Sequence, residues 1–182
     1  MRKTIALVVA ATVVLGVGAV AVAGSGGGLK ERLTGFEEVP AISTPGNGEF
    51  RARINEADQE IRYELTFGGM ATDVRQAHIH FENRTNNGAI VTWLCDSATN
   101  PSPRPSTPEC PAAGGTVTGV ILPDDVGTAS AAQGIGPGEF DEFVRAIRAG
   151  ATYANVHTVE RPGGEIRAQL ENSSHGDDNM GD

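Results

Sequence analysis

Short segments in which apolar and polar residues alternate constrain the fold of this chain most strongly. In residues 50–54 and 61–67 every second residue is apolar, and Asn55-Glu56-Ala57-Asp58 forms a turn signal between the two segments. A period of two is typical of half-buried antiparallel strands. Short strands with frequent turn signals favour a sandwich or barrel over alternating β and α units. Further strands are expected at residues 77–81, 89–94, 116–122, 152–156 and 165–170.

One segment has the period of a helix instead. Phe140, Phe143, Val144 and Ile147 fall at i, i+3, i+4 and i+7, and Gly150 follows as a stop signal. This spacing predicts one short helix that covers an edge or end of the sheet. The sequence therefore predicts an all-β antiparallel sandwich or barrel with a single helix.

The N-terminal residues have the pattern of an export signal. Arg2 and Lys3 precede an uncharged apolar run over residues 4–23, which ends in the small-x-small sequence Ala21-Val22-Ala23. This pattern predicts a cleaved signal peptide over residues 1–23 and a Gly-rich linker over 24–28. An uncleaved membrane anchor is the alternative, because the run is about as long as the ~20 residues that span a bilayer. A single domain is expected over residues 29–171, and a disordered acidic tail over 172–182.

The acidic charge of the chain restricts the partners it can have. The 182 residues carry a formal net charge of -9, with 14 Lys and Arg against 23 Asp and Glu. Sustained nucleic-acid binding needs a positive face, for which this chain has little material. The expected partner is an extracellular protein or surface ligand of unknown identity, with no membrane contact once the signal peptide is removed.

The two cysteines fit a secreted or periplasmic address. An even cysteine count in an exported chain predicts a disulfide between Cys95 and Cys110. A metal site built on the pair is the competing interpretation, although the spacing matches no zinc pattern. The segment between them contains four prolines, which exclude a helix or a central strand. Residues 95–110 are therefore expected to form a Pro-rich, disulfide-bounded excursion.

Three of the four histidines lie in expected strands. His78 and His80 share one face of their strand, while Ala77, Ile79 and Phe81 share the other. The same alternation turns His157 and Glu165 away from the core. We therefore expect His78, His80, His157 and Glu165 to lie on outer faces of the sheet.

Such a set has the chemistry of a metal site. Imidazole suits copper and zinc, so the three histidines could hold either metal. Glu165 could be a fourth ligand or could orient an imidazole. The alternative is a hydrogen-bonded network of surface polar residues without metal. No catalytic constellation of Ser, Cys or His is evident in the chain.

Several motifs, in order along the chain, resemble the chordin-domain (CHRD) family. They are Leu33-Thr34-Gly35-Phe36-Glu37-Glu38-Val39-Pro40, Ala77-His78-Ile79-His80, Gly88-Ala89-Ile90-Val91, the segment from Ala149 to Thr158, and the segment from Gly163 to Leu170. The resemblance covers about residues 29–171. Ala168 stands where the family more often has Gly, and residues 95–110 resemble an insertion.

The resemblance implies an exported domain with an immunoglobulin-like β-barrel that has been likened to copper/zinc superoxide dismutases. It implies no settled activity. We expect a non-catalytic extracellular binding module with a His-based copper or zinc site. A copper enzyme similar to superoxide dismutase is one alternative, but it would need further metal histidines, for which His175 is a poor substitute. A protein-binding module with a purely structural histidine network is the other.

Overall fold

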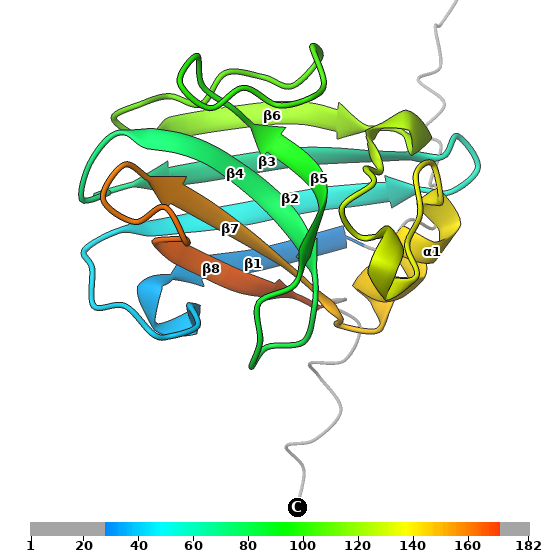
Figure 1. Ribbon diagram of the computed structural model, residues 1–182, viewed down its shortest axis with the longest axis horizontal. Helices are drawn as coiled ribbons and strands as arrows, with labels where there is room; N and C mark the ends of the chain where they lie inside the picture. Colours follow the sequence, from blue (N-terminus) through cyan, green and yellow to red (C-terminus); the bar gives the residue numbers. More distant parts are fainter. Residues whose placement is uncertain (1–27, 172–182) are drawn as a thin grey trace, which may run out of the picture.

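The structure, a computed structural model, describes residues 28–171 (Figure 1). The expected signal peptide, the linker up to residue 27 and the acidic tail lie outside the described residues. Within 28–171, no helix is long and apolar enough to cross a membrane. The strands are β1 (Gly28–Thr34), β2 (Asn47–Asn55), β3 (Glu60–Gly68), β4 (Val74–Phe81), β5 (Ala89–Cys95), β6 (Gly115–Ile121), β7 (Thr152–Thr158) and β8 (Ile166–Leu170), and the one α-helix described is α1 (Phe140–Arg148).

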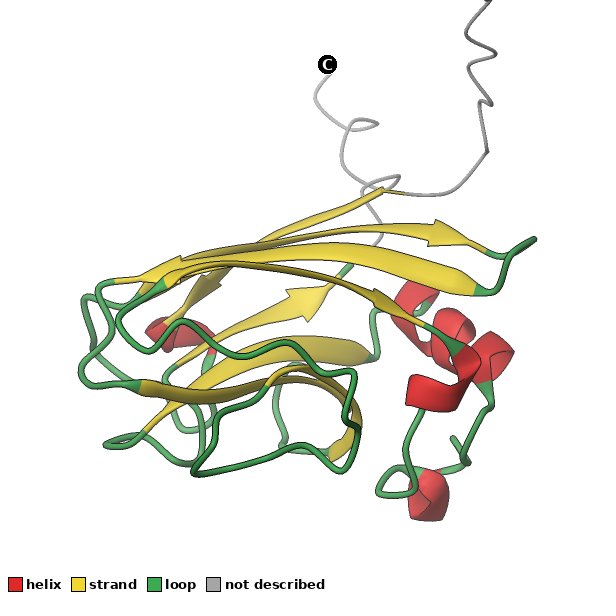
Figure 2. Ribbon diagram, turned by 90° about the horizontal axis from the view of Figure 1, so that it is seen from above, coloured by secondary structure: helices red, strands yellow, loops and turns green. Residues whose placement is uncertain are grey.

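The eight strands form one antiparallel, nearly closed barrel, as the sequence predicted. Their order is β5-β4-β7-β8-β1-β2-β3-β6. A single residue pair, Thr34 with Arg167, joins β1 to β8. The barrel therefore divides at this seam into an open half (β6, β3, β2 and β1) and a covered half (β5, β4, β7 and β8), which form the two layers of Figure 2.

The two edge strands, β5 and β6, approach each other without pairing as a ladder. The Tyr63 hydroxyl on β3 donates a 2.6 Å hydrogen bond to the Leu94 carbonyl on β5. Just after β6, the Gly127 amide donates to the Val91 carbonyl at 2.8 Å. These two bonds satisfy edge carbonyls across the remaining gap.

The open half follows its alternating sequence closely. On β2, Phe50, Ala52 and Ile54 are buried, whereas Arg51 and Arg53 are exposed. β3 alternates in the same way along its whole length. The apolar face of each strand therefore lines the barrel interior, and the polar face meets solvent.

β1 is a strand that the alternation did not predict. Its sequence Gly-Leu-Lys-Glu-Arg-Leu-Thr has apolar residues only at Leu29 and Leu33. Both leucines are buried, because residues four apart lie on the same face of a strand as well as of a helix. Between them, burial raises the pKa of the Glu31 carboxyl. A charged residue at the central inward position hides the period of two.

The helix lies where the sequence placed it, at one end of the barrel (Figures 1 and 2). Its apolar stripe, formed by Phe140, Phe143, Val144 and Ile147, is buried in the core. The polar faces of its first and last turns carry Asp141 and Arg148. The helix thus closes the end of the barrel with the face that its 3.6-residue period defines.

Candidate metal centre

The pairing of β4 with β7 places the three histidines on one face of the sheet. His78 lies opposite Asn155, and His80 lies opposite Tyr153. His157 lies opposite Gln76 on the same face. The residues between them, such as Ile79 and Ala154, belong to the barrel core. The direction predicted from alternation is therefore confirmed for all three histidines.

The histidines lie on this outer face of the sheet, but they are not open to solvent. His78, His157 and His80 are only 1%, 5% and 8% exposed. Four chain segments contact side chains of this face, and we call them the covering segments: residues 36–40, 82–88, 95–110 and 159–164. Alternation shows which way a side chain points, but it carries no information about loops that return over that face.

The main chain of the covering segments binds two of the imidazoles directly. His80 Nδ1 lies 2.9 Å from the Gly88 carbonyl oxygen, and His157 Nδ1 lies 3.0 Å from that of Pro162. A carbonyl oxygen only accepts, so in each ring Nδ1 carries the proton and donates. In the neutral form of each ring, Nε2 is then left with its lone pair. This arrangement, a ligand imidazole oriented through its other nitrogen, is usual at metal sites.

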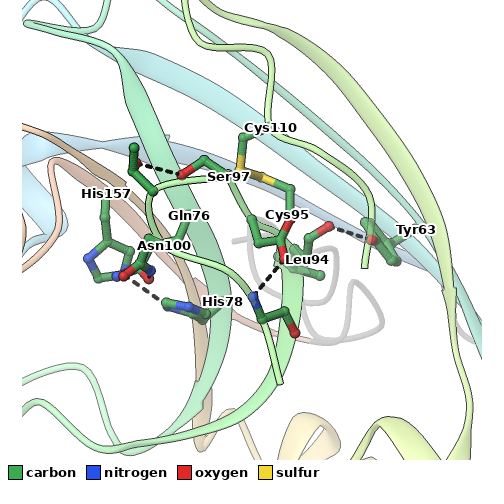
Figure 3. The surroundings of a disulfide bond; sticks show 12 residues. Tyr63, Gln76, His78, Leu94, Cys95, Ser97, Asn100, Cys110 and His157 are labelled. Atoms are coloured by element: carbon green, nitrogen blue, oxygen red, sulfur yellow. Dashed lines mark hydrogen bonds between the residues drawn. A yellow bond between two sulfur atoms is a disulfide. The ribbon is translucent and has the colours of Figure 1, made fainter. Parts of the chain in front are cut away.

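The three rings meet in one cluster. His78 Nδ1 lies 3.2 Å from His157 Nε2 (Figure 3). Each of the three rings offers a ligand atom within 4.8 Å of the other two. His78 Nε2 and His80 Nε2 are buried and have no hydrogen-bond partner. Two nitrogens that bind one metal at 2.0–2.1 Å lie at most about 4.2 Å apart, so any pair near the 4.8 Å limit would have to move closer together to bind one ion. The donor set therefore fits a metal after a small movement of the rings.

The surroundings keep the cluster neutral. Burial lowers the pKa of His80 and His157 to about 4, and it lowers the pKa of His78 well below its usual value of 6.5. The neighbouring imidazoles add to this effect at His78 and His157, because two positive charges at this separation repel. At neutral pH the rings hold the uncharged form that binds metals.

Aromatic side chains line the cluster. The ring of Trp93 on β5 meets His78 edge to face at 4.3 Å between centroids. The ring of Tyr153 stacks on His80 at 4.7 Å, and the Arg167 guanidinium lies 3.4 Å from the centre of the Tyr153 ring. Because β7 lies between β4 and β8, Tyr153 separates His80 from Arg167.

The structure does not bring Glu165 to the histidines. One of its carboxylate oxygens accepts hydrogen bonds from Thr44 Oγ1 at 2.6 Å and from the Ala71 amide at 2.9 Å. The other accepts from Thr158 Oγ1 at 2.7 Å. Glu165 is also fully buried, and it is not part of the histidine group. It precedes β8 and follows Gly164, whose positive φ of 123° turns the chain, and strand alternation therefore does not extend to it.

Instead, sequence reasoning missed a different carboxyl group, that of Glu38. It lies in the segment between the short 3-10 turn Gly35–Glu37 and β2, is 5% exposed, and has one buried oxygen without a hydrogen-bond partner. Burial raises its pKa to about 7, against the opposing effect of Arg167. A Cβ at Gly164 would lie 2.3 Å from a Glu38 oxygen, so this glycine makes room for it. No periodicity marks Glu38 in the sequence.

Asn155 and Arg167 were also missed, although alternation could have found them. Asn155 lies two residues before His157, and its side-chain amide is 2.9 Å from His157 Nε2, to which the amide NH2 can donate when it faces that nitrogen. Arg167 pairs with Asn155 across β7 and β8 and donates to the Asn83 and Asn86 carbonyls at 3.0 and 3.1 Å. Both therefore belong to the face that carries the histidines.

The expected disulfide is present. Cys95 and Cys110 are bonded, and both are buried (Figure 3). The segment they bound folds back toward β4, where Asn100 donates to the Gln76 side chain. Gln76 lies opposite His157, so this excursion forms part of the cover. A disulfide is usual in an oxidising, extracytoplasmic environment, so the bond supports that location for the domain.

The family profile described as the CHRD domain matches residues 29–170. Neither the curated proteins nor the solved structures contain a match to this chain.

Proposed function

The chain belongs to the CHRD domain family, and within that family we propose that it is a secreted, non-catalytic binding module that holds copper or zinc at His78, His80 and His157. Its partner would be an extracellular protein or surface ligand. The signal-peptide pattern of the sequence and the Cys95–Cys110 disulfide support export.

The observation that carries the metal proposal is the pair of unpartnered nitrogens. His78 Nε2 and His80 Nε2 are buried without a hydrogen-bond partner, and both rings belong to the three-histidine cluster. A buried polar atom without a partner costs about 1–3 kcal/mol, which folding rarely tolerates without a compensating role. A metal ion would use both lone pairs at once.

Burial of the cluster supports a binding role over catalysis. A copper enzyme of the dismutase type needs a coordination position that its anionic substrate can reach. The three imidazoles are at most 8% exposed, and the chain has a formal net charge of -9. Both features oppose the approach of a small anion to the site.

Elemental analysis and calorimetric titration of the purified protein with copper and zinc would test this function. We expect one metal per chain, and we expect binding to disappear in His78→Ala, His80→Ala and His157→Ala. His175→Ala is the matched control, because His175 is the fourth histidine of the chain and lies outside the described cluster. This variant should bind as the unchanged protein does.

Circular dichroism of each variant would show whether it remains folded. His80→Gln, which keeps a polar side chain of similar length, provides a second test if the alanine variants unfold. A folded protein that binds neither metal at pH 7, where the imidazoles are neutral, would refute the proposal in favour of a structural histidine network.

A further inference from the structure

We infer that the cluster selects copper in its monovalent state, bound by the three imidazole nitrogens alone. The inference rests on the proposed function, since it concerns which metal the same site takes. Three features of the described residues carry it: the charge of the donors, their number, and the aromatic side chains beside them.

The donors carry no negative charge. His78, His80 and His157 are neutral ligands, and among the described residues no carboxylate or thiolate joins the group. The cost of burying an ion grows with the square of its charge in the Born picture, so it is about four times larger for a divalent than for a monovalent ion. At 1–8% exposure the histidines give little access to water that could offset this difference.

The buried charged residues near the cluster do not offset the larger cost of burying a divalent ion. The Arg167 guanidinium lies against the Tyr153 ring, which in turn stacks on His80, and its positive charge opposes a further cation. Glu38 interacts with Arg167 and Asn155, and it is not one of the grouped ligand residues. Neither Glu38 nor the fully buried Glu165 joins the ligand group, so no carboxylate ligand would neutralise a divalent metal.

The number of donors also favours copper(I). Zinc in a closed site takes four protein ligands almost without exception, whereas this buried group offers three. Zinc here would need a water or hydroxide to complete its shell. Copper(I) has a filled d shell and is satisfied by two or three ligands, and imidazole suits copper.

Aromatic rings contact two of the three imidazoles. Trp93 meets His78 at 4.3 Å, and Tyr153 stacks on His80 at 4.7 Å. Such rings help to exclude water, and Trp93 supplies a probe of the site. It is the one tryptophan in the chain and its ring contacts His78, so its fluorescence can report on a change at that imidazole.

Anaerobic titration of the purified protein would test the inference. Copper(I), kept reduced by ascorbate so that the disulfide stays intact, is compared with zinc(II) by competition against a chelator of known affinity for each metal. We expect one copper(I) per chain, quenching of the Trp93 fluorescence, and a dissociation constant at least about tenfold lower for copper(I) than for zinc. His80→Gln should lose this binding, and His175→Ala should keep it.

A Trp93→Phe variant separates the probe from the site. It should lose the fluorescence signal but keep its copper(I) affinity in the chelator competition. Zinc affinity equal to or above that of copper(I) would overturn the inference and leave the proposed metal site standing. Failure of both metals to bind would overturn the two proposals together. Equal copper(I) affinity in folded His80→Gln would place the metal outside the cluster and also refute the inference.

Discussion

The strands in both halves of the barrel point alternate side chains toward the core, and the two halves differ in what lies over their outer faces. In the open half, the outward residues of β2 and β3, such as Arg51 and Arg62, are exposed to solvent. In the covered half, every residue of β7 and β8 is buried, including those that face away from the core. Alternation therefore fixes the direction of a side chain, and loops decide whether water reaches it.

The same difference separates weak from strong polar interactions. The open half carries surface ion pairs such as Arg62 with Glu60, at 2.8 Å and with the arginine side chain 66% exposed. Pairs of this kind contribute about 0–1 kcal/mol. In the covered half, Arg167 donates to the Asn87 side chain and to two main-chain carbonyls while lying over Tyr153. Water cannot replace these interactions once they are lost.

Substitution of one arginine in each half gives the largest expected contrast. Arg167→Met removes the donors that hold residues 83–87 and leaves Glu38 without its nearby cation. Loss of one partner from a buried charged network costs about 3–5 kcal/mol in the free energy of unfolding. Arg62→Met in the open half should change it by no more than about 0.5 kcal/mol. Urea denaturation of both variants measures the contrast, and equal effects would show that the cover contributes nothing.

Removal of the disulfide should have the next largest effect. The bond joins residues 15 apart, and a cross-link over such a loop stabilises by about 3 kcal/mol in the chain-entropy model. A Cys95→Ala/Cys110→Ala double variant should lose about that amount in urea denaturation. Because the loop contacts β4 through Asn100 and Gln76, hydrogen exchange should also accelerate in β4. Acceleration in β2 of the same extent would mean that the bond stabilises the barrel as a whole and does not specifically hold the cover.

Acid should destabilise the covered half through its histidines. Their pKa is near 6.5 in the unfolded chain, and it is about 4 for His80 and His157 in the folded state. The unfolded chain therefore binds more protons between these values, so stability is full above about pH 6.5 and is lost as the pH falls toward 4. Each of these two imidazoles accounts for about 2–3 kcal/mol of that loss.

Glu38 has the opposite effect on the stability as the pH falls. Its carboxyl has a raised pKa of about 7 in the folded state, so the folded protein takes up this proton at a higher pH than the unfolded chain does. The histidine contribution is isolated by comparing His80→Gln with the unchanged protein. In metal-free urea denaturation at pH 7 and pH 4, the variant should lose about 2–3 kcal/mol less than the unchanged protein. Identical losses would mean that His80 is not held neutral by burial.

Much of the fold follows from local patterns in the sequence. The strands of the open half, the helix at Phe140 and the bond between Cys95 and Cys110 each rest on residues near one another or on a simple count. The alternation did not predict β1, because Glu31 occupies an inward position between Leu29 and Leu33. Its pairing with β2, which buries both leucines, is a tertiary effect that no local pattern contains.

The candidate site followed from the sequence only in part. The shared face of His78, His80 and His157 came from alternation, and the pairing of β4 with β7 brought the strands together. The burial of these rings and the position of Glu38 beside this face depend on where the covering segments pack. Strand alternation carries no information about that packing. Glu165 shows a second limit of prediction from alternation. The turn at Gly164 separates Glu165 from the regular strand, so the alternation does not give the direction of its side chain.

The carbonyls that orient His80 and His157 belong to the main chain of Gly88 and Pro162, which has consequences for how the protein can vary. Every amino acid has a carbonyl, so the covering loops can exchange many of their side chains over evolution while the imidazoles keep their direction. What selection must preserve is the path of the backbone. At Gly88 a Cβ would lie 2.0 Å from the Phe81 oxygen, so this position has no substitute.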